Sequence, residues 1–288
     1  MENEFQNSSS MTPLSSPPPN SFAVPIAIII AGMLIGGSII YSNSASGRSV
    51  SAEGGQNSAP VAKTVVIKPG TTDDHVLGSR NASLMFVEYS DLECPFCKVF
   101  QGTMHALMDE YGKDGRIAWT YRHFPIDSLH PKARKESEAT ECANELGGNQ
   151  KFWQYLDKIY EITPSNNGLD PAKLKSTATE IGLDTKAFDA CLSSGKYAKK
   201  VEGDYQQAVA AGGNGTPHTA IVLSSALSAK NQEKVLAVIS SEFGKIAPNA
   251  IIPKDLFYFN KGGKELIFSG SLPQPVIKAI IDSLLTMK

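Results

Sequence analysis

The sequence EYSDLECPFC, residues 88–97, joins an apolar run to a helix that we expect from Cys94 to about Tyr111. Pro95 suits the first helical turn, where its missing N–H costs nothing. Unpaired N–H groups and the dipole at a helix start stabilise an anion, so Cys94 should ionise more readily than a free cysteine, whose pKa is about 8.5. Cys97 lies on the same helix face, close enough to form a disulfide with Cys94 and too hidden to react first. A strand, C-x-x-C and a helix together predict dithiol redox chemistry.

The C-x-x-C pair by itself also fits half of a zinc site or a plain buried pair of cysteines. A zinc site needs a second close pair of ligands, but Cys142 and Cys191 are isolated in the sequence, and no histidine has zinc-finger spacing. The redox dithiol is therefore the preferred interpretation, and we expect neither a metal nor an organic cofactor.

The N-terminal quarter of the chain differs from the rest. Residues 1–21 are rich in Ser, Pro and Asn and are expected to form a disordered tail. Residues 22–41 contain no charge and are long enough to cross a bilayer as a helix, whereas the apolar part of a signal peptide is shorter. We therefore favour an uncleaved membrane anchor over a cleaved signal. Residues 42–62 are expected to form a flexible tether, and residues 63–288 the folded domain.

Charges near the anchor give a conflicting indication of its orientation. Arg48 and Lys63 follow the apolar segment, while Glu2 and Glu4 precede it, and the positive-inside rule would place the domain in the cytoplasm. Cysteine usage indicates the opposite side, because a reactive dithiol and a second candidate disulfide belong in an oxidising compartment. We expect the domain on the extracytoplasmic side. The whole chain has 27 Lys+Arg and 29 Asp+Glu, a net charge of −2 that suggests neither nucleic acid nor an acidic ligand.

The order of secondary structure predicts a mixed sheet covered by helices. Apolar and alternating runs predict strands at 64–68, 83–89, 116–123, 219–223, 256–260 and 265–269, with 69–82 as a loop. Helical spacing predicts helices after Cys97, on either side of Gly147-Gly148, from about Asp170 and Asp184, and at 198–211, 230–245 and 273–285.

Several single residues have more than one interpretation. Cys142 and Cys191 each lie on an apolar helical face, either as separate core thiols or as a structural disulfide, which we favour outside the cytoplasm. Glu88 ends an apolar strand, either reaching solvent or buried as an acid. His130 and His218 are each interpreted as a turn or loop histidine, with substrate contact as the alternative for His218, which directly follows Pro217, and Trp119 and Trp153 are interpreted as core residues.

Taken together, the motifs are similar to those of a known family. The chain resembles the DsbA-like thiol-disulfide oxidoreductases of the thioredoxin superfamily, in particular the membrane-anchored bacterial branch, from about Asp73 to Leu285. The resemblance rests on VEYSD at 87–91 before CPFC at 94–97, YRHFP at 121–125 followed by HP at 130–131, GTP at 215–217 and SGSLP at 269–273.

The resemblance implies an α/β thioredoxin fold with an all-helical insertion at about 125–212, preceded by a single transmembrane helix. It implies that Cys94 attacks, that Cys97 resolves, and that Glu88 is a buried acid that relays protons to the resolving cysteine.

The resemblance also implies a substrate site. Pro217 would be a cis-proline beside the dithiol, and the backbone of Thr216 would pair with an extended substrate segment. Pro95, Phe96 and His218 are expected to contact substrate with them.

Three departures from the family pattern are visible. Phe96 replaces a histidine found in the best-known oxidant member, and Glu93 adds a negative charge beside Cys94. Both changes predict a milder oxidant, because oxidising power comes from stabilising the reduced thiolate form. Residues 225–262 are an addition to which we assign no role.

The expected function is that of a thiol-disulfide oxidoreductase in a bacterial cell membrane, with a single span and an extracytoplasmic catalytic domain. It would introduce disulfides into secreted or membrane proteins, and a quinone-linked membrane partner would reoxidise it. Two alternatives remain: a disulfide reductase or isomerase with the same dithiol, and a tethered chaperone-like binding module whose dithiol is inactive.

Overall fold

The computed structural model describes residues 67–287 except 68, 250–252, 254–255 and 261. The predicted tail, membrane anchor and tether lie outside these residues. Within the part of the chain that the structure describes, no helix is both long and apolar enough to cross a membrane.

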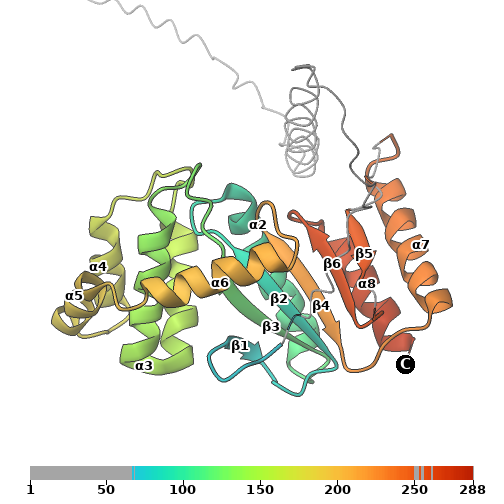
Figure 1. Ribbon diagram of the computed structural model, residues 1–288, viewed down its shortest axis with the longest axis horizontal. Coiled ribbons are helices and arrows are strands. Elements are labelled where there is room, and N and C mark those ends of the chain that lie inside the picture. The colour runs from blue at the N-terminus through green and yellow to red at the C-terminus, as the bar shows by residue number, and fades with distance from the viewer. Residues whose placement is uncertain (1–66, 68, 250–252, 254–255, 261, 288) are drawn as a thin grey trace, which may run out of the picture. The chain divides into compact units, whose positions relative to one another are not determined.

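A six-stranded mixed sheet forms the centre of the described domain, in the order β1-β3-β2-β4-β6-β5 (Figure 1). Strand β2 lies between β3, to which it is parallel, and β4, to which it is antiparallel. The strands are β1 (His75–Gly78), β2 (Leu84–Ser90), β3 (Ile117–His123), β4 (His218–Leu223), β5 (Phe257–Phe259) and β6 (Glu265–Ser269). The predicted mixed sheet and its C-terminal β5–β6 hairpin are confirmed.

Strand β2 is apolar because both of its faces are covered. Leu84 and Phe86 belong to the core formed with helices α2 (Pro95–Leu107) and α8 (Gln274–Thr286). Met85 and Val87 face the other side, in the core shared with α6 (Ala198–Ala210), which crosses β2 and β3 in Figure 1. Side chains alternate along a strand, so Glu88 lies on the face that packs against α2.

The predicted helical insertion is present, and its first three helices gather on the left in Figure 1. It consists of α3 (Ala133–Ile162), α4 (Ala172–Glu180) and α5 (Thr185–Ser194), followed by α6, which returns across the sheet (Figure 1). Cys142 on α3 and Cys191 on α5 form a disulfide with an S–S distance of 2.01 Å, so the sequence-based preference for a bond over separate thiols is confirmed.

The glycine pair inside α3 interrupts the helix as its sequence predicts. Gly147 and Gly148 have non-helical dihedral angles, and Gly148 has a φ of 69°, which residues with a Cβ rarely adopt. Just after this break, the side-chain amide of Asn149 donates to the carbonyl of Val76 on β1 at 2.8 Å.

Two boundaries differ from the sequence-based expectation. Residues 69–82 are not all loop, because they contain β1, whose four residues pair with β3. Of the expected strand at 64–68 the structure describes Ile67 alone, which is not in a strand and whose N–H donates to Glu265 Oε1 at 3.1 Å. Strand β1 is too short to show an alternating pattern, and the turn residues Gly70 and Gly78 indicated a loop.

The segment at 225–262 contains α7 (Ala229–Ile246), an amphipathic helix that packs on α8. Ser228 caps its N-terminus by accepting a hydrogen bond from the N–H of Asn231. This segment therefore extends the hydrophobic core beside the last helix.

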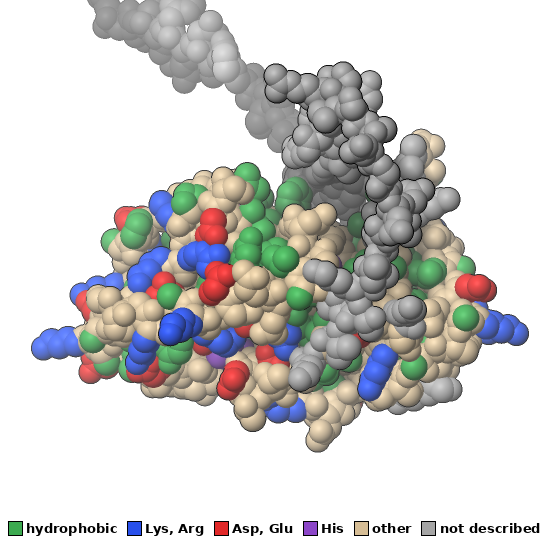
Figure 2. All heavy atoms as spheres, viewed as in Figure 1, with side chains coloured by type: hydrophobic (Ala, Val, Ile, Leu, Met, Phe, Trp, Pro, Cys, Tyr) green, Lys and Arg blue, Asp and Glu red, His purple; other side chains and the backbone are tan. Residues whose placement is uncertain are grey.

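The surface carries no dominant charge. In the face drawn in Figure 2, basic and acidic side chains are interspersed over the helical insertion. This pattern agrees with the net charge of −2.

Candidate active site

Cys94 stands at the boundary between the loop after β2 and helix α2. Its backbone is extended, with φ −78° and ψ 122°, and the helix begins at Pro95. Only 5% of Cys94 is exposed and none of Cys97 is, so the second thiol is the more hidden one, as predicted. Both cysteines are free thiols in this structure.

The structure favours the thiolate form of Cys94. The pKa of the Cys94 thiol is lowered to about 7, chiefly because the Cys97 thiol donates a hydrogen bond to it. The Thr216 side chain and the Cys97 backbone N–H, at the start of the helix, also lower this pKa, while burial and the Asp91 carboxylate oppose them. At neutral pH a large share of Cys94 is therefore ionised.

Cys97 has the opposite tendency. Burial raises its pKa well above that of an ordinary thiol, and the negative charges of Cys94 and Glu88 add to this effect. The backbone N–H of Asp91 lies 3.5 Å from Cys97 Sγ. Cys94 thus favours the reactive thiolate form, and Cys97 favours the protonated thiol.

The loop between helix α6 and strand β4 lies beside Cys94. The Thr216–Pro217 peptide bond is cis, and the Thr216 carbonyl oxygen lies 3.5 Å from Cys94 Sγ. Pro95, Phe96 and Thr216 are each half-buried at this site.

The His218 side chain is buried and its ring nitrogens have partners inside the protein, contrary to the expected contact with substrate. The imidazole is 1% exposed, Nδ1 lies 2.8 Å from Ser269 Oγ, and Nε2 lies 3.2 Å from the Ala211 carbonyl oxygen. Its position in β4, inside the sheet, explains the difference, because residues on both faces of this strand are buried.

Glu88 is a buried acid and does not reach solvent. Burial raises its pKa to about 7, and the Cys94 thiolate contributes in the same direction, while the neighbouring Ser90 hydroxyl and Trp119 indole oppose it. Trp119 Nε1 donates to Glu88 Oε2 at 2.9 Å. Oε1 has no hydrogen-bond partner within the described part of the chain. Trp119 and Trp153 are core residues, as predicted, and Trp119 also holds this acid.

Known proteins match both this sequence and this geometry. Residues 70–240 match the thioredoxin family. The chain belongs to this family. Among solved structures, its fold is similar to Pseudomonas aeruginosa DsbA2, with a TM-score of 0.51, 22% identity, and coverage of 74% of this chain and 95% of that one. It is also similar to Wolbachia pipientis alpha-DsbA1, with a TM-score of 0.54, 19% identity, and coverage of 75% and 92%.

Two relatives with similar sequences are much longer proteins. An Na(+)/H(+) antiporter NhaA 1 from Mycolicibacterium vanbaalenii is 32% identical over 155 residues, which is 53% of this chain and 24% of that protein. An Na(+)/H(+) antiporter NhaA from Herminiimonas arsenicoxydans is 35% identical over 144 residues, or 50% of this chain and 21% of that protein. The chain thus spans less than a quarter of the length of these relatives.

The family match, the DsbA-like fold and the Cys94–Cys97 pair together confirm the predicted enzyme class, a thiol-disulfide oxidoreductase with a C-x-x-C motif. Within this thioredoxin-family site, the expectation about Glu93 needs correction, and His130 makes a contact that the sequence did not predict.

Glu93 does not place its carboxylate against Cys94. Its side chain is fully buried and turns toward the insertion, where Oε1 accepts from the N–H of Leu169 at 3.2 Å and Oε2 lies 3.5 Å from the Thr163 hydroxyl. Glu136 on α3 lies against it, and burial together with the Glu93 carboxylate raises the pKa of Glu136 to about 9. The raised pKa favours the protonated form of Glu136 at neutral pH. Asp91 is the acid that opposes ionisation of Cys94.

His130 lies in a loop, as predicted, and it also contacts the site. It is 5% exposed, and its Nδ1 lies 2.9 Å from Asp91 Oδ2 in the loop before Cys94. Sequence reasoning missed this contact because 39 residues separate the two partners. The one available signal is that the HP motif at 130–131 belongs to the resemblance.

A cluster of hydroxyl groups behind the dithiol was also missed. Ser90 Oγ lies 2.9 Å from Tyr160 OH, which lies 3.1 Å from Tyr121 OH. The sheet register gave a signal for one member, because Tyr121 is the partner of Glu88 on the neighbouring strand. Tyr160 comes from α3, and no local pattern connects it to β2.

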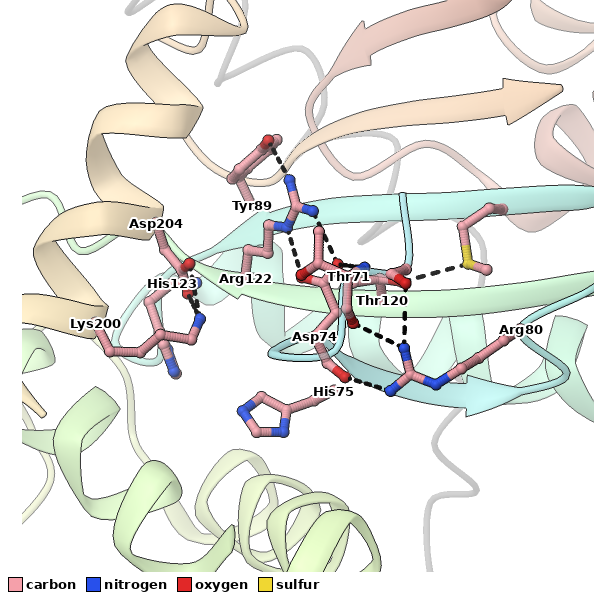
Figure 3. Close-up of polar contacts among 12 residues, drawn as sticks. Thr71, Asp74, His75, Arg80, Tyr89, Thr120, Arg122, His123, Lys200 and Asp204 are labelled. Atoms are coloured by element: carbon pink, nitrogen blue, oxygen red, sulfur yellow. Dashed lines mark hydrogen bonds and ion pairs between the residues drawn. The ribbon is translucent and has the colours of Figure 1, made fainter. Parts of the chain in front are cut away.

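A separate buried network holds β1 against the sheet (Figure 3). Arg122 donates to both oxygens of Asp74 at 2.9 Å and to Tyr89 OH at 2.9 Å. A bidentate pair of this kind fixes both position and orientation. Its role is to attach the segment before β1 to the central strands.

One nearby group among the described residues has the composition of a metal site. Ligand atoms of His123, Glu141 and Asp204 lie within 4.8 Å of one another. Glu141 Oε1, however, lies 2.9 Å from Nε2 of both His75 and His123, and Lys200 donates to both oxygens of Asp204. Protein groups thus already bind these carboxylates, and the network is explained as a structural one.

Proposed function

We propose that the protein oxidises thiols of other proteins, transferring its Cys94–Cys97 disulfide to them. The supporting observation is the divergence of the two thiols, since the pKa of Cys94 falls to about 7 while that of Cys97 is raised. A stabilised Cys94 thiolate makes the reduced form more favourable, which is the property of an oxidant.

The exchange proceeds in two steps. A substrate thiolate attacks Cys94 Sγ, the Cys94–Cys97 bond breaks, and Cys97 leaves as a thiolate that takes a proton. A second substrate thiolate then attacks the substrate sulfur of the mixed disulfide and releases the Cys94 thiolate. The substrate loses two electrons, and the dithiol gains them.

Glu88 is the proposed source of the proton for Cys97. It lies on the β2 face that packs against α2, its carboxylate charge raises the pKa of Cys97, and its own pKa of about 7 lets it hold or release a proton at neutral pH. The unpartnered Oε1 leaves one oxygen available for this transfer.

The substrate segment is proposed to lie extended along the Thr216–Pro217 loop and to add its backbone beside Cys94. Phe96 is half-buried at this position. Its aromatic side chain favours apolar neighbours of the substrate cysteine, such as those of an unfolded chain.

We place this activity outside the cytoplasm, anchored through residues 22–41 and reoxidised by a quinone-linked partner in a bacterial cell membrane. The support is indirect. A buried disulfide and a reactive dithiol in one domain suit an oxidising compartment. Sequence similarity to a part of proteins named as Na(+)/H(+) antiporters fits a domain that works close to a membrane.

Turnover of a reduced, unfolded substrate protein tests the proposal. The Cys94→Ser variant should lose all turnover. If the protein were instead a binding module with an inactive dithiol, this substitution would leave its binding of unfolded chains intact. The direction of transfer follows from the reduction potential of the Cys94–Cys97 pair. A value near −120 mV supports an oxidase, and a value near about −270 mV would instead indicate a reductase.

A further inference from the structure

The Asp91 carboxylate is the most constrained charge beside the dithiol. Oδ1 accepts from the N–H of Glu93 at 2.8 Å, and Oδ2 accepts from the N–H of Ile126 at 2.7 Å and lies 2.9 Å from Nδ1 of His130. The side chain is completely buried. These bonds attach the loop before Cys94 to the first loop of the helical insertion.

Asp91 affects both cysteines. Its carboxylate raises the pKa of Cys94, and its backbone N–H lies 3.5 Å from Cys97 Sγ. A buried carboxylate without a compensating charge is costly, and it disfavours a second anion nearby. The Cys94 thiolate would therefore be disfavoured if the Asp91 charge were not balanced.

His130 is positioned to balance it. The hydrogen bond with Asp91 raises the pKa of His130, and the charges of Asp91 and of the Cys94 thiolate raise it further, with an added contribution from Asn166, while burial opposes them. These groups favour the imidazolium form while Cys94 is ionised. Attraction between charges is reciprocal, so the same imidazolium stabilises the thiolate.

We propose that His130 is a positioning residue of the dithiol, which binds the Asp91 carboxylate as an imidazolium and cancels its charge beside Cys94. The apolar Phe96 cannot supply a cation from within the C-x-x-C motif, and His130 supplies one from the insertion. The inference rests on the proposed function and deepens it, because it assigns part of the redox tuning to a residue outside the thioredoxin core.

The test is a pH titration of the ultraviolet absorbance of the Cys94 thiolate in the full chain. His130→Gln keeps a hydrogen-bond donor without a charge, and it should raise the Cys94 pKa by about one unit, a tenfold loss of thiolate at low pH. His130→Lys keeps a cation and should leave the pKa near its native value. Asp91→Asn combined with His130→Gln removes both charges and should also return it toward that value.

A structural role alone would give a different pattern, in which the double variant is at least as perturbed as His130→Gln. That pattern, or an unchanged pKa in His130→Gln, would overturn the proposal. His75→Gln is the matched control, because His75 is also 5% exposed and lies 2.9 Å from a buried carboxylate, Glu141. His75→Gln should reduce stability without changing the Cys94 pKa. If it raised that pKa as much as His130→Gln does, the shift would reflect a general loss of packing.

Substrate turnover by the wild-type protein is measured in parallel. Its absence would contradict the proposed oxidase, while the titrations would still decide whether His130 controls the Cys94 thiol.

Discussion

Replacing Glu88 with Gln removes the ionisable proton of the buried acid and leaves its size nearly unchanged. Glu88 is fully buried, and burial is the largest cause of its raised pKa. The folded protein therefore binds this proton more tightly than the unfolded chain does. The stability that this difference provides is fully present below the ordinary pKa of 4.5 and is lost as the pH rises through about 7.

The size of the effect follows from the two pKa values. With 4.5 in the unfolded chain and about 7 in the folded protein, wild type loses about 3 kcal/mol of unfolding free energy between acid and mildly alkaline pH through this one group. Glu88→Gln does not titrate and escapes this loss. Its stability relative to wild type should thus improve by about 3 kcal/mol between pH ~4 and pH ~8.5.

Urea unfolding of both proteins at the two pH values measures this difference. The Cys94–Cys97 disulfide is kept intact in both, so that neither thiol titrates; the minor contribution of the Cys94 thiolate to the Glu88 pKa is then absent, and burial, its largest cause, is what the experiment measures. Glu233→Gln, which changes an exposed carboxyl on α7, is the control for the general effect of removing a charge. A relative stability of Glu88→Gln that is the same at both pH values would refute the argument that Glu88 is desolvated.

Three further predictions follow from the same geometry. Replacing Cys97 with Ala should raise the pKa of Cys94, since the Cys97 hydrogen bond is the main cause of its low value, and the pH dependence of alkylation measures this. Replacing both Cys142 and Cys191 with Ser opens a loop of 49 residues and should lower the unfolding free energy by about 4 kcal/mol, while Cys94-dependent turnover persists. Glu136→Gln should gain stability relative to wild type as the pH rises from 4.5 to about 9, as denaturant unfolding across that range would show.

Local sequence patterns were sufficient to predict the reactive Cys94–Cys97 dithiol. The apolar strand, the proline after Cys94 and the C-x-x-C spacing are all contiguous, so the chemistry of a thiol at a helix start could be read from ten residues. The disulfide between Cys142 and Cys191 was also predictable, because both cysteines lie on apolar helical faces.

Residues whose role depends on distant partners could not be assigned in this way. Glu93 precedes Cys94 in the chain, yet its carboxylate turns toward Leu169, which is 76 residues away. His130 has no neighbour in sequence that reveals its bond with Asp91. For Glu93 the backbone direction at the start of α2 decides which way the side chain points, and for His130 the path of the insertion does; the charge pattern alone contains neither.

The amide of Asn149 has a consequence for association between molecules. Among the described strands, β1 pairs with β3 alone, and an outer strand normally offers free acceptors to the backbone of another chain. Here Asn149 occupies the Val76 carbonyl, and the Arg80 guanidinium occupies the carbonyl of Asp74 at 2.9 Å. An incoming segment would have to displace both side chains before it could extend the sheet. For a protein proposed to handle unfolded chains, this protection keeps its clients from joining the sheet at the wrong edge.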